Sequence, residues 1–305
     1  MKWLYVIFRN CFFMKQRKVW KNMKLSVELY TLSKRFGDCE AIKLTKKCGF
    51  DAIDYSYYWD KEKEVLGENY REFAQNIRKC LEENDMYCNQ AHAPFSFAYE
   101  NKMDISDEKY LWLVRSLESA AILGAENIVV HSVNVPTGVD FEEYNTLFYK
   151  SLVKYCEKFK IHIAVENLFS IDTKRKCVKG KIGTAEELNR IVKKIDSPWV
   201  VACVDIGHAA LTGNEPENFI EQMSSNTLKS LHVQDNDYVS DRHTVPYLGE
   251  LNWTAIMQSL KRIEYAGDLT FEIFNYLKRF PDELIPEALR FAASVGRYLI
   301  SIYDN

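Results

Sequence analysis

Short apolar runs alternate with longer amphipathic segments along the chain from residue 24 onward. Runs of about four to eight apolar residues bounded by turn-forming residues are typical of buried strands, and apolar residues spaced three and four apart are typical of helices that pack on a sheet. The pattern predicts strands at residues 25–29, 52–55, 86–91, 127–130, 162–165, 200–204, 230–233 and 269–273. It predicts a helix after each strand, at residues 38–48, 69–84, 107–123, 141–159, 185–195, 215–223, 252–264 and 281–300.

This regular alternation predicts an α/β fold in which a closed parallel sheet is surrounded by helices, the (β/α)8 TIM barrel. An open, doubly wound sheet is the alternative, and it usually has a glycine-rich phosphate-binding turn after its first strand. Residues 30–36 contain no glycine, which favours the barrel. Because no linker, composition shift or internal repeat divides the chain, we expect residues 23–305 to form a single domain.

Residues 1–22 differ from the rest of the chain in charge. They contain six basic residues and no acidic one. The apolar stretch at residues 3–8 is interrupted by Arg9, and no small-residue cleavage site follows it, which argues against a secretory signal. We expect residues 1–22 to be a basic N-terminal extension outside the fold, with Met23 as an alternative translation start.

The net charge of the whole chain is -3, but the predicted barrel is more acidic. Without residues 1–22 it has 34 basic and 43 acidic residues, a net charge of -9. Nucleic acid is therefore disfavoured as a partner, since DNA affinity depends on phosphate neutralisation. No apolar run approaches the roughly 18 residues of a membrane-spanning helix. The eight cysteines form no CxxC pair, so we expect buried thiols and a cytoplasmic location.

The chemistry-bearing residues follow the predicted strands. TIM barrels place their active sites at the carboxyl-terminal ends of the strands. The residues at or just after those ends are His92, His131, Glu166, Asp205, His208, His232, Asp241, His243 and Glu272. Five imidazoles and four carboxylates at one rim predict a bound cation. Mixed nitrogen and oxygen ligands suit Mn²⁺, Zn²⁺, Co²⁺, Fe²⁺ or Mg²⁺. The remaining histidine, His162, begins its strand at the opposite end, and we expect it to be structural.

Several segments resemble the xylose isomerase-like TIM barrel superfamily over about residues 24–300. They read HAPFSF after the third strand, IVVHS at the fourth, IAVENLF at the fifth, VVACVDIGHAALTG at the sixth, LHVQDNDYVSDRHTVPYLGELNW after the seventh and LTFEI at the eighth. Within the superfamily, the chain is most similar to bacterial sugar phosphate isomerase/epimerase proteins. The resemblance implies a small-molecule sugar substrate and a metal ion held by Glu166, Asp205, His232 and Glu272.

The resemblance also implies a mechanism. In such a site the metal acts as a Lewis acid that stabilises an enediolate, and Glu166 and Glu272 transfer the proton. By similarity to the epimerases, His208 and Arg242 contact substrate oxygens, although His208 could instead orient the metal ligands. Xylose isomerase itself has a lysine just after its strand-five glutamate, which serves a hydride shift. This chain has Asn-Leu-Phe-Ser at residues 167–170, which favours proton transfer. No glycine-rich nest follows the last strands, so the word "phosphate" in the family name assigns no substrate.

Two other functions remain open. The endonuclease IV branch of the superfamily uses a three-metal site with nine ligands, and all nine strand-end residues named above match it in type. The acidic barrel and the isomerase-like ending G-x-x-x-W, at residues 249–253, oppose a nuclease. A non-catalytic sugar-binding barrel is the third alternative. Related enzymes often form dimers or tetramers, so a homo-oligomer is compatible with the resemblance, but no interface motif is readable.

Overall fold

The structure is a computed structural model that describes residues 23–58, 65–95, 97–174 and 176–305. The predicted basic extension, residues 1–22, lies outside the described residues, so its role stays a prediction. Within the described part of the chain, no helix is long and apolar enough to cross a membrane.

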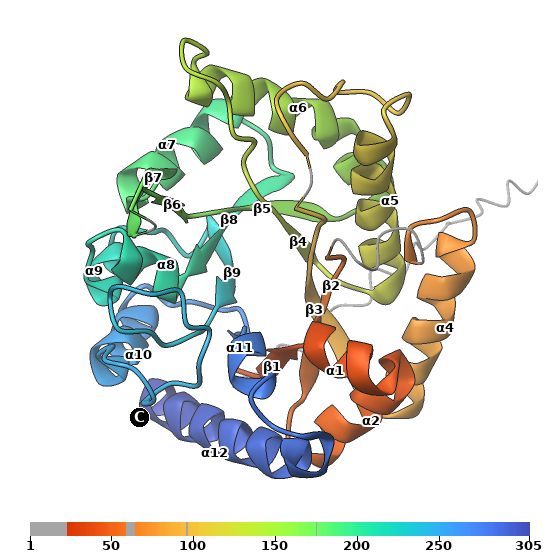
Figure 1. Cartoon of the computed structure of the whole chain (residues 1–305), viewed down its shortest axis with the longest axis vertical. Coiled ribbons are helices and arrows are strands. Elements are labelled where there is room, and N and C mark those ends of the chain that lie inside the picture. The colour runs from red at the N-terminus through yellow and green to blue at the C-terminus, as the bar shows by residue number, and fades with distance from the viewer. Residues whose placement is uncertain (1–22, 59–64, 96, 175) are drawn as a thin grey trace, which may run out of the picture.

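Eight parallel strands form a barrel, as the alternation of strands and helices predicts (Figure 1). They are β1 (Leu25–Glu28), β2 (Ala52–Ser56), β3 (Tyr87–His92), β4 (Asn127–Val130), β5 (His162–Glu166), β8 (Val200–Asp205), β9 (Leu228–His232) and β10 (Leu269–Phe271). The order of hydrogen-bonded neighbours is β10-β1-β2-β3-β4-β5-β8-β9. A parallel bridge between Val233 and Phe271 joins the two ends of this order. The predicted (β/α)8 fold is confirmed.

The eight predicted helices surround this barrel (Figure 1). They are α2 (Asp38–Lys47), α4 (Tyr70–Glu83), α5 (Glu108–Leu123), α6 (Phe141–Phe159), α7 (Ala185–Ile195), α9 (Pro216–Glu221), α10 (Trp253–Arg262) and α12 (Ile285–Asp304). Local capping fixes several boundaries. The side chain of Asp107 accepts hydrogen bonds from two backbone N–H groups at the start of α5, and Thr184 forms a capping box at α7. Gly124 ends α5 with φ +93°, a left-handed conformation that suits glycine.

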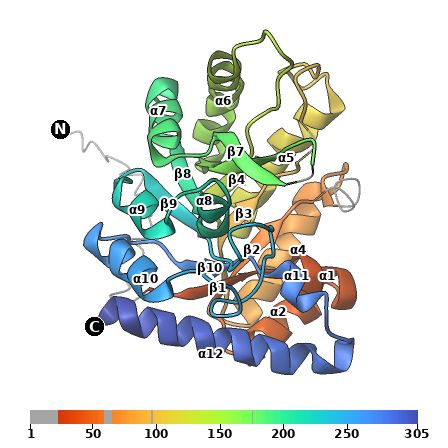
Figure 2. The same ribbon diagram turned by 60° about the vertical axis from the view of Figure 1, so that its left-hand side comes forward.

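Within the described residues, six further short elements were not predicted from the sequence. They are α1 (Tyr30–Phe36), β6 (Leu168–Ile171), β7 (Cys177–Ile182), α8 (Ile206–Leu211), α11 (Phe274–Leu277) and the 3-10 turn η1 (Asp282–Leu284). Each lies between the end of a barrel strand and the next long helix, at the end where chemistry is expected. The antiparallel β6–β7 hairpin lies next to α8 (Figure 2). These elements are too short for a helical or strand period to be readable.

Two cores stabilise the barrel. The larger one packs the outward side chains of the strands against the helices. A second, smaller cluster contains Val129, Ala164, Val201 and Cys203, which come from three adjacent strands. Val129 pairs with Ala164 and Ala164 with Val201, so these three side chains point to the same face of the sheet, the barrel interior. Residues of this size fill the interior below the strand ends and leave the ends themselves to polar side chains.

Candidate metal centre

The four predicted metal ligands lie together at the carboxyl-terminal ends of the strands. Glu166 ends β5, Asp205 ends β8, His232 ends β9, and Glu272 directly follows β10. All four side chains are buried. Glu166 Oε1 is 2.8 Å and Glu272 Oε2 is 3.6 Å from His232 Nδ1. Ligand atoms of Asp205, His232 and Glu272 all lie within 4.8 Å of one another. The barrel topology brings the four together because its last residues meet at one rim.

The other five residues that the sequence places at the rim extend this cluster on both sides. They form two further groups, His92 and His131 beside Glu166, and His208 with Asp241 and His243. On one side, Nε2 of His131 is 3.2 Å from Nε2 of His92 and 2.7 Å from Oε2 of Glu166. On the other side, Nε2 of His243 is 3.0 Å from Oδ2 of Asp241.

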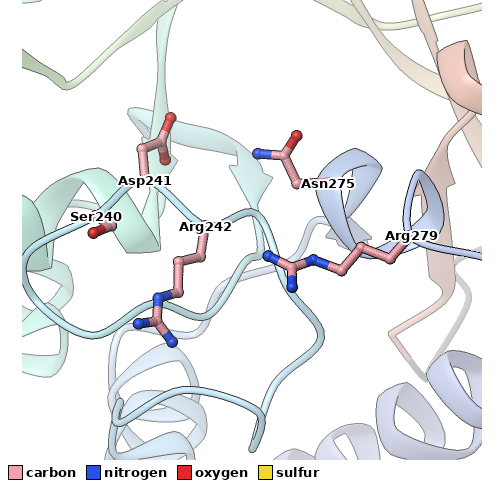
Figure 3. A pocket seen from close by; sticks show the side chains of 5 residues that line it. All are labelled: Ser240, Asp241, Arg242, Asn275 and Arg279. Atoms are coloured by element: carbon pink, nitrogen blue, oxygen red, sulfur yellow. The ribbon is translucent and has the colours of Figure 1, made fainter.

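Arg242 is separate from this cluster. Its side chain is about half exposed, and its guanidinium lies 2.5 Å from the carboxylate of Asp237. Figure 3 shows the side chains of Asp241 and Arg242 pointing to opposite sides of their loop. Arg242 therefore lines a neighbouring pocket, and its predicted contact with substrate oxygens stays a prediction.

The cluster fits a divalent cation. Two of its atoms, Glu166 Oε2 and Asp205 Oδ2, are buried without a hydrogen-bond partner in the described structure. Glu166 Oε2 lies close to His131 Nε2 but is not aligned with it as a hydrogen bond. Leaving a buried polar atom unsatisfied costs roughly 1–3 kcal/mol, and more for a charged group. Carboxylate oxygens and imidazole nitrogens that converge in this way are the ligands that Mn²⁺, Zn²⁺ and Fe²⁺ accept.

A cavity of about 770 Å³ opens above the cluster. One wall is polar and includes His131, Glu166 and Glu272. Much of the remaining lining is apolar, and its aromatic members are Phe95, Phe97, Phe141, Phe169 and Phe274. The β6–β7 hairpin contributes further lining residues, among them Lys181, which the sequence analysis did not single out. A polar floor with aromatic walls suits a sugar, whose hydroxyls need polar partners and whose C–H face packs on rings.

The sequence profile of the xylose isomerase-like TIM barrel family matches residues 42–295. The chain belongs to this family. Proteins with similar sequences include the uncharacterized protein MJ1311 of Methanocaldococcus jannaschii, with 30% identity over 66% of this chain and 70% of that protein. The 2-oxo-tetronate isomerase of Haemophilus influenzae is 30% identical over 50% of this chain and 57% of its own length.

Solved structures show the same fold. A D-tagatose 3-epimerase-like protein superposes with a TM-score of 0.71 at 22% identity, covering 92% of this chain and 98% of its own. A D-psicose 3-epimerase in the presence of D-fructose has a TM-score of 0.70 at 17% identity, covering 91% and 99%. The IolI protein with a zinc atom has a TM-score of 0.68 at 17% identity, covering 92% and 98%. At sequence identities this low, the similarity to these structures shows the fold only.

The carboxylates of this family member differ in their affinity for protons. Burial raises the pKa of Glu166, but the imidazoles of His232 and His131 outweigh burial and hold that pKa well below its usual range. Burial acts in the same way on Glu272, and His232 and His243 outweigh it, so the pKa of Glu272 is also lowered. For Asp205 burial dominates and raises the pKa to about 7. Glu166 and Glu272 are thus ionised at neutral pH.

The imidazoles provide the compensating positive charge. Burial lowers the pKa of His232, but the carboxylates of Glu272 and Glu166 outweigh burial and raise that pKa well above its usual value. Burial also opposes protonation of His243, but Glu272 and Asp241 raise its pKa to about 10. In the metal-free protein both imidazoles are protonated at pH 7. A metal ion needs an unprotonated ring nitrogen, so metal and protons compete for this site.

Metal binding is therefore expected to release about one to two protons per ion at pH 7, the proton of His232 and part of the proton of Asp205. The apparent affinity for the metal should rise with pH, because deprotonation of these groups is required for binding. Calorimetric titration of Zn²⁺ in buffers with different ionisation enthalpies measures the release. His162→Asn at the opposite end of β5 is the control and should leave it unchanged. If the heat of Zn²⁺ binding were the same in all buffers, no protons would be released, and this result would contradict competition between metal and protons.

Two residues that the sequence analysis missed, Asp54 and Gln90, support the Nε2 side of the His232 ring. Asp54, in β2, has Oδ2 at 3.4 Å from His232 Nε2. The amide of Gln90, in β3, donates a hydrogen bond of 2.8 Å to the same carboxylate oxygen. With Nδ1 facing Glu166 and Glu272, the ring of His232 is oriented by a buried carboxylate, as is usual for metal-binding histidines. Asp54 could have been found in the sequence as an acidic residue within an apolar strand segment, Ile-Asp-Tyr at residues 53–55.

Other side chains fix the remaining ligands. The hydroxyl of Tyr58 donates to Glu272 Oε1 at 3.0 Å, which leaves Oε2 facing His232. The amide of Gln234 donates to Asp241 Oδ1 at 2.8 Å. Asn167 exchanges two hydrogen bonds with the backbone of Asp205, at 2.8 and 2.9 Å. Tyr58, Gln234 and Asn167 are neutral, so no pattern of charged residues in the sequence indicates that they support the ligands.

Glu28 is a buried acid next to this site. It ends β1, and its carboxylate accepts a hydrogen bond from the backbone N–H of Tyr30. Burial, together with the carboxylates of Asp54 and Glu272, raises its pKa to about 8. The folded protein therefore holds a proton on Glu28 at neutral pH that the unfolded chain, with the ordinary glutamate pKa, releases.

Glu28→Gln is expected to stabilise the metal-free protein. Because the folded pKa is raised, the contribution of Glu28 to stability falls as pH increases from about 4.5 to about 8. Glutamine does not titrate, so the unfolding free energy of Glu28→Gln should exceed that of the wild type by an amount that grows over this pH interval. The difference should reach about 3 kcal/mol at pH 7. Urea unfolding of the chelator-treated protein at several pH values measures it. Glu157→Gln on the exposed face of α6 is the control, and an advantage that stays constant with pH would contradict the assignment.

Proposed function

We propose that the protein is a metal-dependent isomerase or epimerase of a sugar or sugar derivative, with Glu166 and Glu272 as its acid/base pair. The observation that supports this most is the placement of the two carboxylates. Both lie within 3.6 Å of His232 Nδ1, both are buried, and both line the same cavity. Membership of the family and the sequence similarity to a 2-oxo-tetronate isomerase agree with the proposal.

Glu166, Asp205, His232 and Glu272 would hold the metal ion. When bound, a divalent ion supplies a Lewis acid that polarises the substrate carbonyl and lowers the pKa of the neighbouring C–H group. The chain itself fixes the ligands: Asp54 orients His232, and Asn167 binds the backbone of Asp205. Such support keeps ligands in position and commonly affects affinity about 10- to 100-fold.

The proton transfer is assigned to the two glutamates. One carboxylate removes the proton from the carbon beside the carbonyl, and the other returns a proton to the opposite face or to the neighbouring carbon. Both groups are ionised at neutral pH, so either can act first as the base, and the other must take up a proton from solvent or from a substrate hydroxyl before it returns one. Phe95 and Phe169 line this cavity and give it apolar surface.

Turnover of a panel of ketoses, aldoses and 2-keto sugar acids tests the proposal. We expect epimer or isomer formation that disappears after treatment with a chelator and returns on addition of Mn²⁺, Zn²⁺ or Co²⁺. Saturable sugar binding without turnover in the metal-loaded protein would favour a non-catalytic sugar-binding barrel instead.

One observation favours a second function, metal-dependent phosphodiester cleavage. The nine strand-end residues lie in several overlapping groups, three of which together contain all nine: His92, His131 and Glu166; Asp205, His232 and Glu272; and His208, Asp241 and His243. A multi-metal site of this kind suits the activation of water and the stabilisation of a leaving oxygen. The net charge of -9 on residues 23–305 opposes it, since DNA binding needs basic surface.

Metal stoichiometry separates the two functions. One tightly bound ion per chain is expected for the isomerase, and three for the nuclease. Elemental analysis of the purified protein gives this number, and incubation with a duplex that contains an abasic site tests cleavage directly. Three ions together with strand cleavage would replace our proposal by the second function.

A further inference from the structure

A second cavity lies beside the candidate metal centre, between the loop that follows β9 and the helix α11 that follows β10. Its volume is about 710 Å³, and it is lined by Ser240, Asp241, Arg242, Asn275 and Arg279 (Figure 3). Asp241 also lines the larger cavity above the metal centre. The two cavities are therefore adjacent at Asp241.

The charge in this second cavity is positive and incompletely compensated. Arg279 is exposed, and its guanidinium has no hydrogen bond or ion pair with any residue in the described part of the chain. Figure 3 shows it extended toward the loop that carries Arg242. Arg242 is paired with Asp237, which neutralises one of the two charges.

The acidic residue in the lining does not neutralise Arg279. The carboxylate of Asp241 is 3.0 Å from His243 Nε2 and accepts a hydrogen bond from Gln234 at 2.8 Å. Figure 3 shows this carboxylate turned away from the side of the loop on which Arg242 lies. The side-chain amide of Asn275 adds a neutral donor to the same cavity. The donors that remain for a ligand are those of a guanidinium and an amide, which suit an anion.

The position in the fold agrees with this chemistry. β9 and β10 are the seventh and eighth barrel strands, and the loops after these strands are where TIM barrels frequently bind phosphate. Here side chains rather than a glycine-rich backbone would form the site, which explains why the sequence showed no phosphate motif. The planar guanidinium fork matches two oxygens of a phosphate or a carboxylate.

We propose that Arg279, with Asn275, binds an anionic group at the end of the substrate, a phosphate or a carboxylate. This proposal rests on the proposed isomerase function and narrows its substrate class to sugar phosphates or sugar acids. Arg279 binds and positions the substrate and takes no part in the proton transfer.

Titration of inorganic phosphate into the metal-loaded full-length protein tests the site without requiring turnover. Arg279→Ala should weaken phosphate binding about tenfold or more, the usual loss for one charge-assisted pair. Arg279→Lys, which keeps the charge but not the fork, should give an intermediate loss. Arg290→Ala, an exposed arginine on α12, is the control and should bind as the wild type does. A parallel titration with D-gluconate separates the two anions, since the tighter of them identifies the group.

The outcomes separate this proposal from the proposed function. Unchanged phosphate and gluconate binding in Arg279→Ala overturns the anion site, even if neutral sugars are isomerised. Loss of anion binding in Arg279→Ala, with no sugar converted by the wild type, supports the site and overturns the isomerase. With both correct, Arg279→Ala should raise KM for the anionic substrate about tenfold and leave kcat within about twofold.

Discussion

Replacing Glu272 by glutamine is expected to lower kcat for the sugar substrate about a thousandfold while the protein stays folded. A general acid or base contributes roughly 10²- to 10⁴-fold to a rate, and the amide cannot accept the proton. Glutamine keeps an oxygen that can accept the 3.0 Å hydrogen bond from Tyr58, so the side chain should hold its position. Initial rates at saturating metal and substrate measure the effect.

Two controls accompany the Glu272→Gln variant. Elemental analysis shows whether the metal is retained, since Glu272 is also a proposed ligand. Glu157→Gln, on the surface of α6, should have wild-type activity. If Glu272→Gln retained its metal and still exchanged the substrate C–H with solvent at the wild-type rate, Glu272 would not be part of the acid/base pair.

Asp235→Ala is expected to destabilise the protein by about 3–5 kcal/mol and to remove His243 and Asp241 from the metal centre. Asp235 is fully buried at the start of the loop that follows β9. Its carboxylate accepts hydrogen bonds from the backbone N–H groups of Asn236, Tyr247 and Leu251 and from the indole N–H of Trp253, at 2.8–3.2 Å. The alanine variant leaves these buried donors without an acceptor.

Urea unfolding and metal titration measure the two effects of Asp235→Ala. Asp282→Ala is a matched control, because this aspartate makes a surface ion pair with Arg35 at 3.3 Å, and such pairs contribute little. An unfolding free energy within about 0.5 kcal/mol of wild type, the usual margin for surface substitutions, would show that Asp235 does not hold the loop.

The same contacts explain the G-x-x-x-W pattern at residues 249–253. A Cβ on Gly249 would lie 2.3 Å from Asp235 Oδ1 and 2.4 Å from the carbonyl oxygen of Asn236, so the backbone needs glycine there. Trp253 supplies the indole donor to Asp235. The sequence supported a family resemblance through this pattern, but its physical basis is a buried carboxylate that the pattern itself does not contain.

The strands and long helices could be predicted because their periodicity reports burial directly. The helices at residues 141–159 and 185–195 have the predicted bounds. The clustering of the rim residues also followed from topology, since parallel strands of a barrel end at one rim. The hairpin β6–β7 was missed because its residues are mostly half-buried or exposed and alternate weakly.

The support for the ligands could not be predicted in the same way. Asp54 and Glu28 lie inside apolar strand segments, and whether such an acid faces the barrel interior depends on register, which was not known. The pairing of Arg242 with Asp237, and the absence of a partner for Arg279 among the described residues, depend on loop conformation. Loop conformation is set by tertiary contacts such as those of Asp235.

Deuterium incorporation from D₂O tests proton transfer by Glu166 and Glu272 most directly. The metal-loaded protein is incubated in D₂O with ketoses, sugar acids and their phosphates, and the recovered sugars are analysed by NMR. We predict deuterium at the carbon beside the carbonyl of at least one sugar, with none incorporated by Glu166→Gln or Glu272→Gln. Product formed without any deuterium would contradict proton transfer, and no exchange or turnover in any sugar would contradict the isomerase assignment.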